Sequence, residues 1–401
     1  MEVKNITFIG LNYAPEDTAI GLYSTQWVDF LKEKGHNITV ITAFPYYPQW
    51  EISKEYKKRS TFMKEEINGI KILRYKLYVP KNPTFLKRII HLLDFTFGSL
   101  INLYKIKKCD LVISVVPFTS SVLLGYIQKM RFKTKLWMHI QDFEFDAALQ
   151  TGVGNKKNWI YSLLFKLEKW LFSKSDIAST ISQSMLNRLG QKTPSKQFYL
   201  PNWIDEHQID PKTAMRHQFM TSNKLNILYS GNIGDKQDWS AFIDFCNDID
   251  KNKYEIIIVG NGSKKDWVVD KITSFSNVTY YEPVPYAELS DLLCSADAHL
   301  MFQKPDVIDT VMPSKVLGMM ASAKPSIIIG NAFSEVKTIF EESKGGLYFT
   351  KYTPNLITEI DRILSDPGLS EEMGENARNY IIANYSKDQI LNRMERELHD
   401  L

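Results

Sequence analysis

The sequence predicts an α/β protein built from two consecutive doubly wound domains with parallel sheets. Three observations lead to this prediction. Short apolar runs alternate with segments of helical periodicity almost from end to end, which is the pattern of parallel α/β sheets. The chain of 401 residues is longer than one core usually supports. The alternation is interrupted by the polar stretch 201–224. We therefore expect an N-terminal domain of residues 1–204 and a C-terminal domain of residues 205–401, and the last helix could pack back on the first domain.

The expected elements follow this alternation in chain order. In the first half, strands are expected at residues 6–11, 37–42, 70–75, 110–116, 134–140, 176–180 and 197–201, with helices that include Leu22–Lys34 and Trp159–Phe172. In the second half, strands are expected at residues 225–231, 254–260, 277–282, 298–303, 325–330 and 345–350, with helices that include Ser240–Asp250 and Pro313–Ala323. The segment Ser370–Leu401 reads as mostly helical and charged.

Charge is distributed unevenly along the chain. Residues 1–204 hold 29 Lys and Arg against 16 Asp and Glu, a net +13, and residues 205–401 hold 20 against 30, a net −10. The basic half is expected to face an anionic partner. Nucleic acid is disfavoured because no binding module is recognisable. An anionic membrane surface remains, where each nearby Lys or Arg contributes about 1 kcal/mol.

Several features indicate a cytoplasmic protein that lies peripherally at the inner membrane. The three cysteines are scattered singly, and the chain enters a strand without a visible signal peptide. The apolar stretch Leu111–Ile127 contains a proline and four Ser or Thr residues, so we interpret it as strand, loop and helix. The segment Pro83–Lys108 has an apolar body and basic ends. An interfacial helix and a core helix with solvated ends explain it equally well.

The first strand–helix turn lacks the G-x-G-x-x-G pattern of dinucleotide-binding folds, which makes an NAD-dependent dehydrogenase a poor candidate. Gly21 precedes the expected helix, and Ser24 and Thr25 in its first turn are possible caps. A loose anionic contact or the close approach of a sugar fits this turn, and a simple loop glycine is the alternative.

Two stretches of the second half are suited to an anionic ligand. In "SGNIGDKQ", Lys236 follows a strand and its glycines, so that backbone N–H groups and an ammonium oppose negative charge. In "MPSK", Pro313 is expected to open a helix whose first turn holds Ser314 and Lys315. In the first half, "HIQDFEFDAA" ends a strand with His139 and three carboxylates. Its spacing superficially resembles a divalent-metal motif.

The chain resembles bacterial glycosyltransferases of the GT-B fold, of the family-4-like kind. It is most similar to the subgroup that makes colanic acid, capsule and O-antigen, including fucosyl- and N-acetylfucosaminyltransferases. The resemblance rests on blocks that span most of the chain in the expected order, namely "NYAPEDTAIGLYSTQWVDFLKEKGHNITVITAFPYYPQW", "WMHIQDFEFDAA", "FYLPNWID", "LYSGNIGDKQ", "VGNGS" and "VMPSKVLGMMASAKP".

The resemblance implies two Rossmann-like domains that face a cleft. The second domain would hold the diphosphate of a UDP- or GDP-linked sugar, and the first would serve the acceptor and close over the sugar. The implied donor-site residues are Gly21, Gly231, Asn232, Lys236, Gln237, Gly260, Val284, Asp309, Pro313, Ser314 and Lys315. No metal and no other cofactor are expected, because such enzymes neutralise the diphosphate with basic groups and helix dipoles.

The sequence departs from the family pattern at two places. Asn232 stands where many relatives have Arg, so one positive charge is missing or supplied elsewhere. Gly318 stands where many relatives have a Glu that reaches the ribose. A carboxylate near the acceptor could deprotonate its hydroxyl or stabilise the transition state. Asp142 is the first candidate, followed by His139 and Glu144, with a loop-orienting or structural role as the alternative.

The resemblance, taken together with these residues, implies a hexosyltransferase that moves a sugar, with fucose and N-acetylfucosamine as candidates, onto a polyprenyl-diphosphate-linked glycan. Two other functions stay open. A sugar-nucleotide epimerase of the same fold would need no lipid acceptor. A catalytically inactive partner subunit is conceivable because of Asn232 and Gly318.

Overall fold

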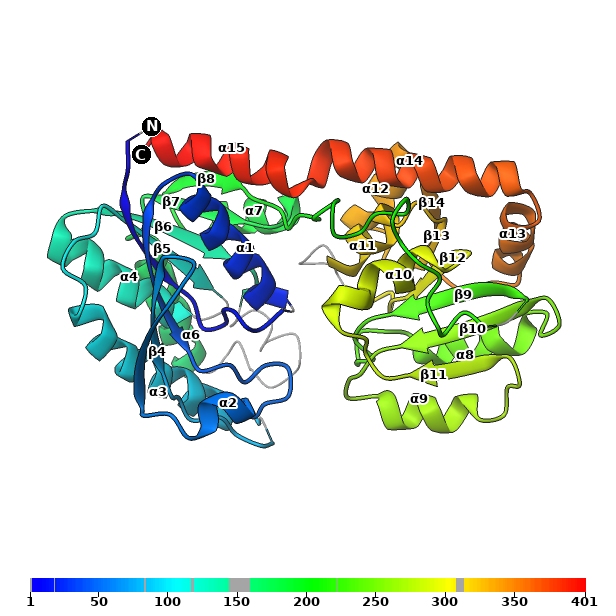
Figure 1. Ribbon diagram of the computed structural model, residues 1–401, viewed down its shortest axis with the longest axis horizontal. Helices are drawn as coiled ribbons and strands as arrows, with labels where there is room; N and C mark the ends of the chain where they lie inside the picture. Colours follow the sequence, from blue (N-terminus) through cyan, green and yellow to red (C-terminus); the bar gives the residue numbers. More distant parts are fainter. Residues whose placement is uncertain are drawn as a thin grey trace. The chain divides into compact units, whose positions relative to one another are not determined.

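The computed structural model describes residues 2–17, 19–82, 84–116, 119–143, 159–221, 223–307 and 314–401. The chain divides into two compact units (Figure 1). One unit consists of Met1–Pro201 with Leu391–Leu401, and the other consists of Asn202–Ile390. Each unit has its own sheet and its own hydrophobic core.

The first unit contains an eight-stranded sheet in the order β3-β4-β2-β1-β5-β6-β7-β8. The central strand β1 pairs in parallel with β2 and with β5. All residues of β5 are buried, as expected of a strand covered on both faces. The bounds are β1 Asn5–Ile9, β2 Asn37–Ala43, β3 Phe62–Ile67, β4 Ile70–Tyr75, β5 Leu111–Val116, β6 Lys135–Ile140, β7 Ile177–Thr180 and β8 Lys196–Tyr199.

The seven strands predicted in this half are all present, and β3 is an eighth that was not predicted. It forms a hairpin with β4, in which Phe62 pairs with Tyr75 and Ile67 with Ile70. Both residues of the connecting turn, Asn68 and Gly69, have positive φ, as a two-residue hairpin turn requires.

Helices cover both faces of this sheet. They are α1 Ala19–Glu33, α2 Lys54–Lys57, α3 Phe85–Tyr104, α4 Thr119–Phe132, α6 Trp159–Phe172 and α7 Gln183–Gly190. α3 contacts α4 and α4 contacts α6, so these three helices lie side by side on one face (Figure 1). The connection from β1 to β2 through α1 runs across the sheet in the opposite direction to the connections through α3, α4 and α6. Because such crossovers are right-handed, α1 lies on the other face of the sheet. There Trp27 packs edge-on against Phe8 and Trp137.

The expected start of α1 was wrong. The helix already includes Ala19, so Gly21 lies within its first turn and Ser24 is a buried residue further along. Thr25 does not cap the helix. Its hydroxyl donates to the carbonyl of Gly21 at 2.8 Å and accepts from the amide of Ala14 at 2.9 Å.

The second unit contains a six-stranded parallel sheet in the order β11-β10-β9-β12-β13-β14, and the six strands predicted for this half are present. The bounds are β9 Leu225–Ser230, β10 Tyr254–Val259, β11 Val278–Tyr281, β12 Ala298–Phe302, β13 Ser326–Ile329 and β14 Gly346–Phe349. The chain runs outward from β9 in one direction and from β12 in the other. The carboxyl ends of β9 and β12 therefore flank the crevice where ligands bind in such sheets.

Two core clusters lie on the two faces of the second sheet. Phe242 of α8 and Ile360 of α13 belong to one cluster, and Val316 of α11 and Ala377 of α14 belong to the other. The helices are α8 Trp239–Asp248, α9 Lys265–Ile272, α10 Leu289–Cys294, α11 Ser314–Ala321, α12 Glu335–Ser343, α13 Asn355–Leu364, α14 Pro367–Tyr385 and α15 Lys387–His399.

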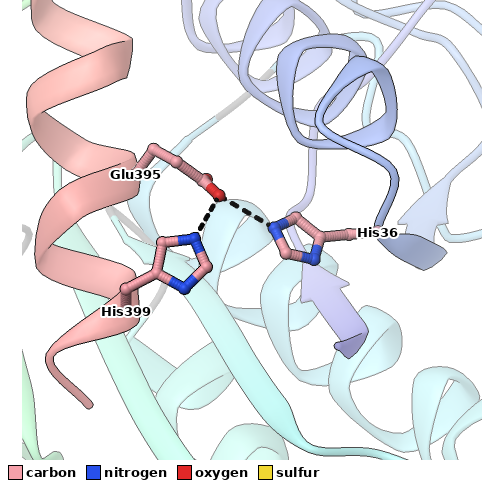
Figure 2. A group of neighbouring side chains, drawn as sticks. All are labelled: His36, Glu395 and His399. Carbon is pink, nitrogen blue, oxygen red and sulfur yellow. Dashed lines mark hydrogen bonds and ion pairs between the residues drawn. The ribbon is translucent and has the colours of Figure 1, made fainter. Parts of the chain in front are cut away.

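The boundary between the units falls inside α15, after Ile390. The end of this helix is fixed to the first unit by several side chains. The indole N–H of Trp27 contacts the sulfur of Met394 at 3.3 Å, and the ammonium of Lys34 donates to the Asn392 side chain at 2.9 Å. The carboxylate of Glu395 lies between the rings of His36 and His399 (Figure 2).

Candidate functional site

Two glycine loops meet at the carboxyl ends of β9 and β10 in the second unit. Gly231 follows β9 and has a φ of +136°, a conformation that favours glycine. Gly260 follows β10, and a Cβ added there would stand 1.9 Å from the Gly231 carbonyl oxygen. The two backbones therefore touch at a point that no larger residue than glycine fits.

The loop after β9 is held by internal hydrogen bonds. The amide of Ile233 donates to the carbonyl of Asn261 at 2.9 Å. The buried side chain of Gln237 accepts from the amide of Gly234 at 3.0 Å, and the indole of Trp239 donates to the Gly234 carbonyl at 3.1 Å. Gln237 thus braces the loop from within. The side chain of Asn232, on the same loop, is exposed.

Lys315 in the first turn of α11 reaches over this loop. Its Cδ is 3.2 Å from the position of a Gly231 Cβ. The Lys315 ammonium lies 4.7 Å above the centre of the Tyr229 ring and 3.4 Å from the Tyr229 hydroxyl. That hydroxyl donates to the carbonyl of Asn232 at 2.7 Å. Burial raises the pKa of Tyr229, so the phenol stays neutral and orients the lysine beside the glycine.

Lys236 lies on the same loop with an exposed side chain, and its carbonyl accepts from the amide of Lys304 at 3.0 Å. The neighbouring Lys264 is paired with Asp235 at 3.2 Å. Glycine backbone and several ammonium groups thus gather at one edge of the sheet. Such an arrangement can bind a diphosphate, because the ammonium groups oppose its negative charge.

The predicted donor-site residue Val284 lies in packed surroundings, and so do Gly318 and Tyr281. Val284 packs against the core cluster that contains α11. A Cβ added to Gly318 would stand 3.2 Å from Leu293, so this position of α11 contributes to helix packing against α10. Tyr281, at the end of β11, stacks on Phe219 with ring centres 3.8 Å apart.

In the first unit, the structure describes two of the catalytic candidates, Asp142 and His139, and they lie in different surroundings. Asp142 is half-buried and lies two residues beyond β6. His139 is buried inside the unit. Its Nδ1 lies 2.9 Å from the Ser179 hydroxyl, and its Nε2 lies 3.0 Å from the side-chain amide nitrogen of Gln141. Burial lowers the pKa of His139 to about 3, so the ring is neutral at pH 7.

Gly21 has a structural reason to be glycine. A Cβ there would stand 2.8 Å from the carbonyl oxygen of Glu16. Glu16 is buried, and its carboxylate accepts from the amides of Tyr46 and Tyr47, both at 2.8 Å. Gly21 therefore lets the loop that carries Glu16 pack on α1. A role toward the donor stays a prediction.

Some predicted residues lie outside the described residues, namely Glu144, Asp309 and Pro313. Ser314 is the first residue of α11. Sequence reasoning did not identify Tyr229 or Glu16. Tyr229 had no usable signal, because an aromatic residue in a buried strand usually packs in the core. Glu16, in contrast, is an acid within the same loop that was singled out for Gly21.

Among the described residues, one group has the composition of a metal site, namely His36, Glu395 and His399 (Figure 2). The Nε2 atoms of His36 and His399 each lie 3.0 Å from the same oxygen of Glu395. The amide of Lys4 donates to Nδ1 of His36 at 3.2 Å. The proton of neutral His36 must therefore sit on Nε2, where it is donated to Glu395. A metal would need the opposite tautomer, so the geometry is that of a structural hydrogen bond.

The chain is similar to known glycosyltransferases. A family model described as glycosyl transferases group 1 matches residues 212–380. The Escherichia coli (strain K12) protein named as the colanic acid biosynthesis glycosyl transferase WcaI is 34% identical over 359 residues, which cover 85% of this chain and 86% of that protein.

Solved structures with a similar fold cover nearly the whole chain. Sucrose-phosphate synthase from Thermosynechococcus elongatus has a TM-score of 0.76 at 14% identity, over 99% of this chain and 98% of that chain. Alr3699/HepE from Anabaena, in complex with UDP and glucose, has a TM-score of 0.70 at 13% identity, over 99% of this chain and 100% of that chain. At 13–14% sequence identity, structural similarity of this kind is evidence of a shared fold alone.

Proposed function

Since the chain belongs to the group 1 glycosyl transferase family, we propose that it moves a hexose from a nucleoside-diphosphate sugar to a polyprenyl-diphosphate-linked glycan. Its membership makes it a glycosyltransferase, and its two α/β units have the GT-B fold that the sequence predicted. The proposed setting is the synthesis of a surface polysaccharide, which the 34% identity to a protein named for colanic acid biosynthesis supports. Fucose and N-acetylfucosamine are the first sugars to test.

One observation carries the proposal, the arrangement of Gly231, Gly260 and Lys315 at the carboxyl edge of the second sheet. Glycine at both positions lets the loops after β9 and β10 pack tightly, and hydrogen bonds within the unit hold their backbone in a fixed conformation. The Lys315 ammonium lies directly above this loop. The arrangement lies within residues 212–380, the part that matches the family model. We assign the diphosphate of the donor to this place, with Lys236 as a second cation.

The chemistry of this site follows from charge. As the bond between sugar and diphosphate breaks, negative charge grows on the leaving diphosphate, and Lys315 and Lys236 would stabilise it. Asp142 is the proposed acid or base of the first unit. It would accept the proton of the acceptor hydroxyl or stabilise positive charge on the sugar. His139 is less suited to proton transfer, because it is neutral at pH 7 and enclosed.

The test begins with nucleotide binding. A thermal-shift screen against UDP, GDP and their sugars should identify one nucleotide, and Lys236→Ala should then weaken its binding about tenfold or more, because a charge-assisted hydrogen bond contributes about 1.5–3 kcal/mol. Purified enzyme with that donor should then extend a polyprenyl-diphosphate-linked glycan.

Other outcomes of this experiment would replace the proposal. An isomerised donor without any transfer would indicate an epimerase. Nucleotide binding without turnover of any donor or acceptor would indicate an inactive partner subunit. If Lys236→Ala bound the nucleotide as tightly as the wild type, Lys236 would not belong to the donor site.

A further inference from the structure

The outer face of α3 carries a continuous apolar stripe. Its most exposed apolar residues recur every three or four positions and, at 100° per residue, fall within an arc of about 80°. The helix buries its other side, as Phe95 and Leu103 show. Phe97 is 66% exposed, although it lies in the middle of the helix. The stripe consists of Leu86, Ile90, Leu93, Phe97, Ile101 and Tyr104.

A second stripe lies on α6, and α4 connects the two. Leu163, Leu167 and Trp170 of α6 are all exposed and share one side of the helix. The ring of Trp170 packs edge-on against Tyr126 of α4 at 5.9 Å. At the other edge of α4, the guanidinium of Arg131 lies 5.2 Å above the ring of Tyr104.

Because α3 contacts α4 and α4 contacts α6 (Figure 1), the two stripes belong to one surface. We name it the α3–α4–α6 face. It also includes the exposed Met130. Ten of the seventeen large apolar side chains that are exposed among the described residues lie on it, so it is the main apolar surface of that part of the chain.

The charges around this face are predominantly positive, and one of the basic residues, Lys129, is paired with Asp176 at 2.7 Å. The described parts of the three helices contain two carboxylates, Asp94 and Glu168, and both are used within the unit. Asp94 accepts from the Tyr75 hydroxyl at 3.0 Å and from the amide of Tyr78 at 2.6 Å. Glu168 is buried and paired with Lys192 at 2.5 Å. The basic residues of the helices and their ends are Lys87, Arg88, Lys105, Lys107, Lys108, Lys129, Arg131, Lys133, Lys166, Lys169 and Lys174.

We propose that the α3–α4–α6 face docks on the surface of an anionic lipid bilayer. Apolar side chains flanked by Lys and Arg are suited to the boundary between headgroups and acyl chains. A second copy of the chain fits poorly, because a symmetric contact would bring like charges together. Among the described helices, none is long and apolar enough to cross a membrane, so the docking would be peripheral. The inference deepens the proposed function, since it says where the enzyme would meet a lipid-linked acceptor.

The first experiment measures partition onto vesicles by flotation. The probes are vesicles of phosphatidylcholine alone and of phosphatidylcholine with 30% phosphatidylglycerol, at about 0.1 M salt. Wild type should bind the anionic vesicles, and binding should fall with salt. The combined variant Leu93→Gln, Phe97→Gln and Ile101→Gln should lower the partition coefficient at least tenfold. The matched control Phe333→Gln, at a 90% exposed residue of the second unit, should bind like wild type.

The second experiment tests α6 on its own. Vesicles that contain brominated acyl chains quench tryptophans that enter the bilayer. Trp170 is 46% exposed and Trp267, in the second unit, is 41% exposed, so they form a matched pair. Trp170→Phe should remove most of the quenching, and Trp267→Phe should leave it unchanged. Equal quenching in the two variants would exclude α6 from the docking surface.

Other results separate this inference from the proposed function. If wild type failed to bind anionic vesicles, the docking inference would be overturned, while nucleotide binding and transfer to a detergent-soluble acceptor would still test the activity. If light scattering showed that the wild type is an oligomer and that the triple α3 variant is a monomer, the face would be a protein interface. In the supporting case, the triple variant keeps the wild-type nucleotide affinity and the wild-type melting temperature within a few degrees, and loses only vesicle binding.

Discussion

Replacing Lys315 by methionine should weaken binding of the donor nucleotide by one to two orders of magnitude. Methionine keeps an unbranched apolar stem at this place, where Lys315 Cδ lies 3.2 Å from the position of a Gly231 Cβ and the ammonium lies 4.7 Å from the centre of the Tyr229 ring. What is lost is the ammonium. A hydrogen bond between charged groups contributes about 1.5–3 kcal/mol, which corresponds to a roughly 10- to 150-fold increase in Kd.

The assay is isothermal titration calorimetry with UDP and GDP at 25 °C. Lys251→Met is the control, because Lys251 lies in the turn that leads into β10, at the opposite edge of the same sheet. It should bind the nucleotide like wild type. Tyr229→Phe removes the hydroxyl that faces Lys315 at 3.4 Å and donates to Asn232. Because one neutral hydrogen bond contributes about 1 kcal/mol, this variant should bind the nucleotide roughly fivefold more weakly. A change of less than threefold in Lys315→Met would refute the assignment of the diphosphate to this loop.

Three further predictions concern other parts of the chain. Asp142→Asn should leave nucleotide binding intact and lower kcat by at least about 100-fold, and a rate near that of wild type would remove Asp142 from the chemistry. Gly260→Ala should weaken nucleotide binding more than tenfold, because the new Cβ would stand 1.9 Å from the Gly231 carbonyl oxygen. Gly368→Ala should bind normally, because its new Cβ would stand 3.4 Å from the Asp366 carboxylate, an ordinary contact distance. Burial lowers the folded-state pKa of His139 to about 3, so protonation favours the unfolded chain, and the free energy of unfolding should fall by about 1.4 kcal/mol between pH 7.5 and 5.5 through this residue. His139→Gln should show a correspondingly shallower pH dependence in denaturant titrations, and an unchanged slope would contradict the neutral buried ring.

The sheets were predictable because parallel strands covered on both faces are continuous apolar runs, such as the residues of β5 and β10. β3 was missed because its sequence, FMKEEI, is an edge strand with mixed polarity. Its hairpin nevertheless carried a local signal, the pair Asn68-Gly69, which is among the strongest indications of a two-residue turn.

The site was predictable only in part. Gly231, Gly260 and Lys315 were predicted separately, and the fold brings them together because β9, β10 and α11 end or begin at one edge of the sheet. The depth of a side chain was not predictable in the same way. Gln237 turns inward to brace its own loop and His139 is enclosed beside Ser179, because both outcomes depend on neighbours distant in sequence.

The way α15 ends has a practical consequence for dissecting this enzyme. The first α/β unit is discontinuous in sequence, since it needs the last eleven residues of the chain as well as the first 201. A fragment that stops at Pro201 would leave the Trp27 indole without Met394 and His36 without its carboxylate partner Glu395. Joining residues 391–401 to such a fragment by a flexible peptide would restore those partners, and it is the form in which the first unit could be studied alone.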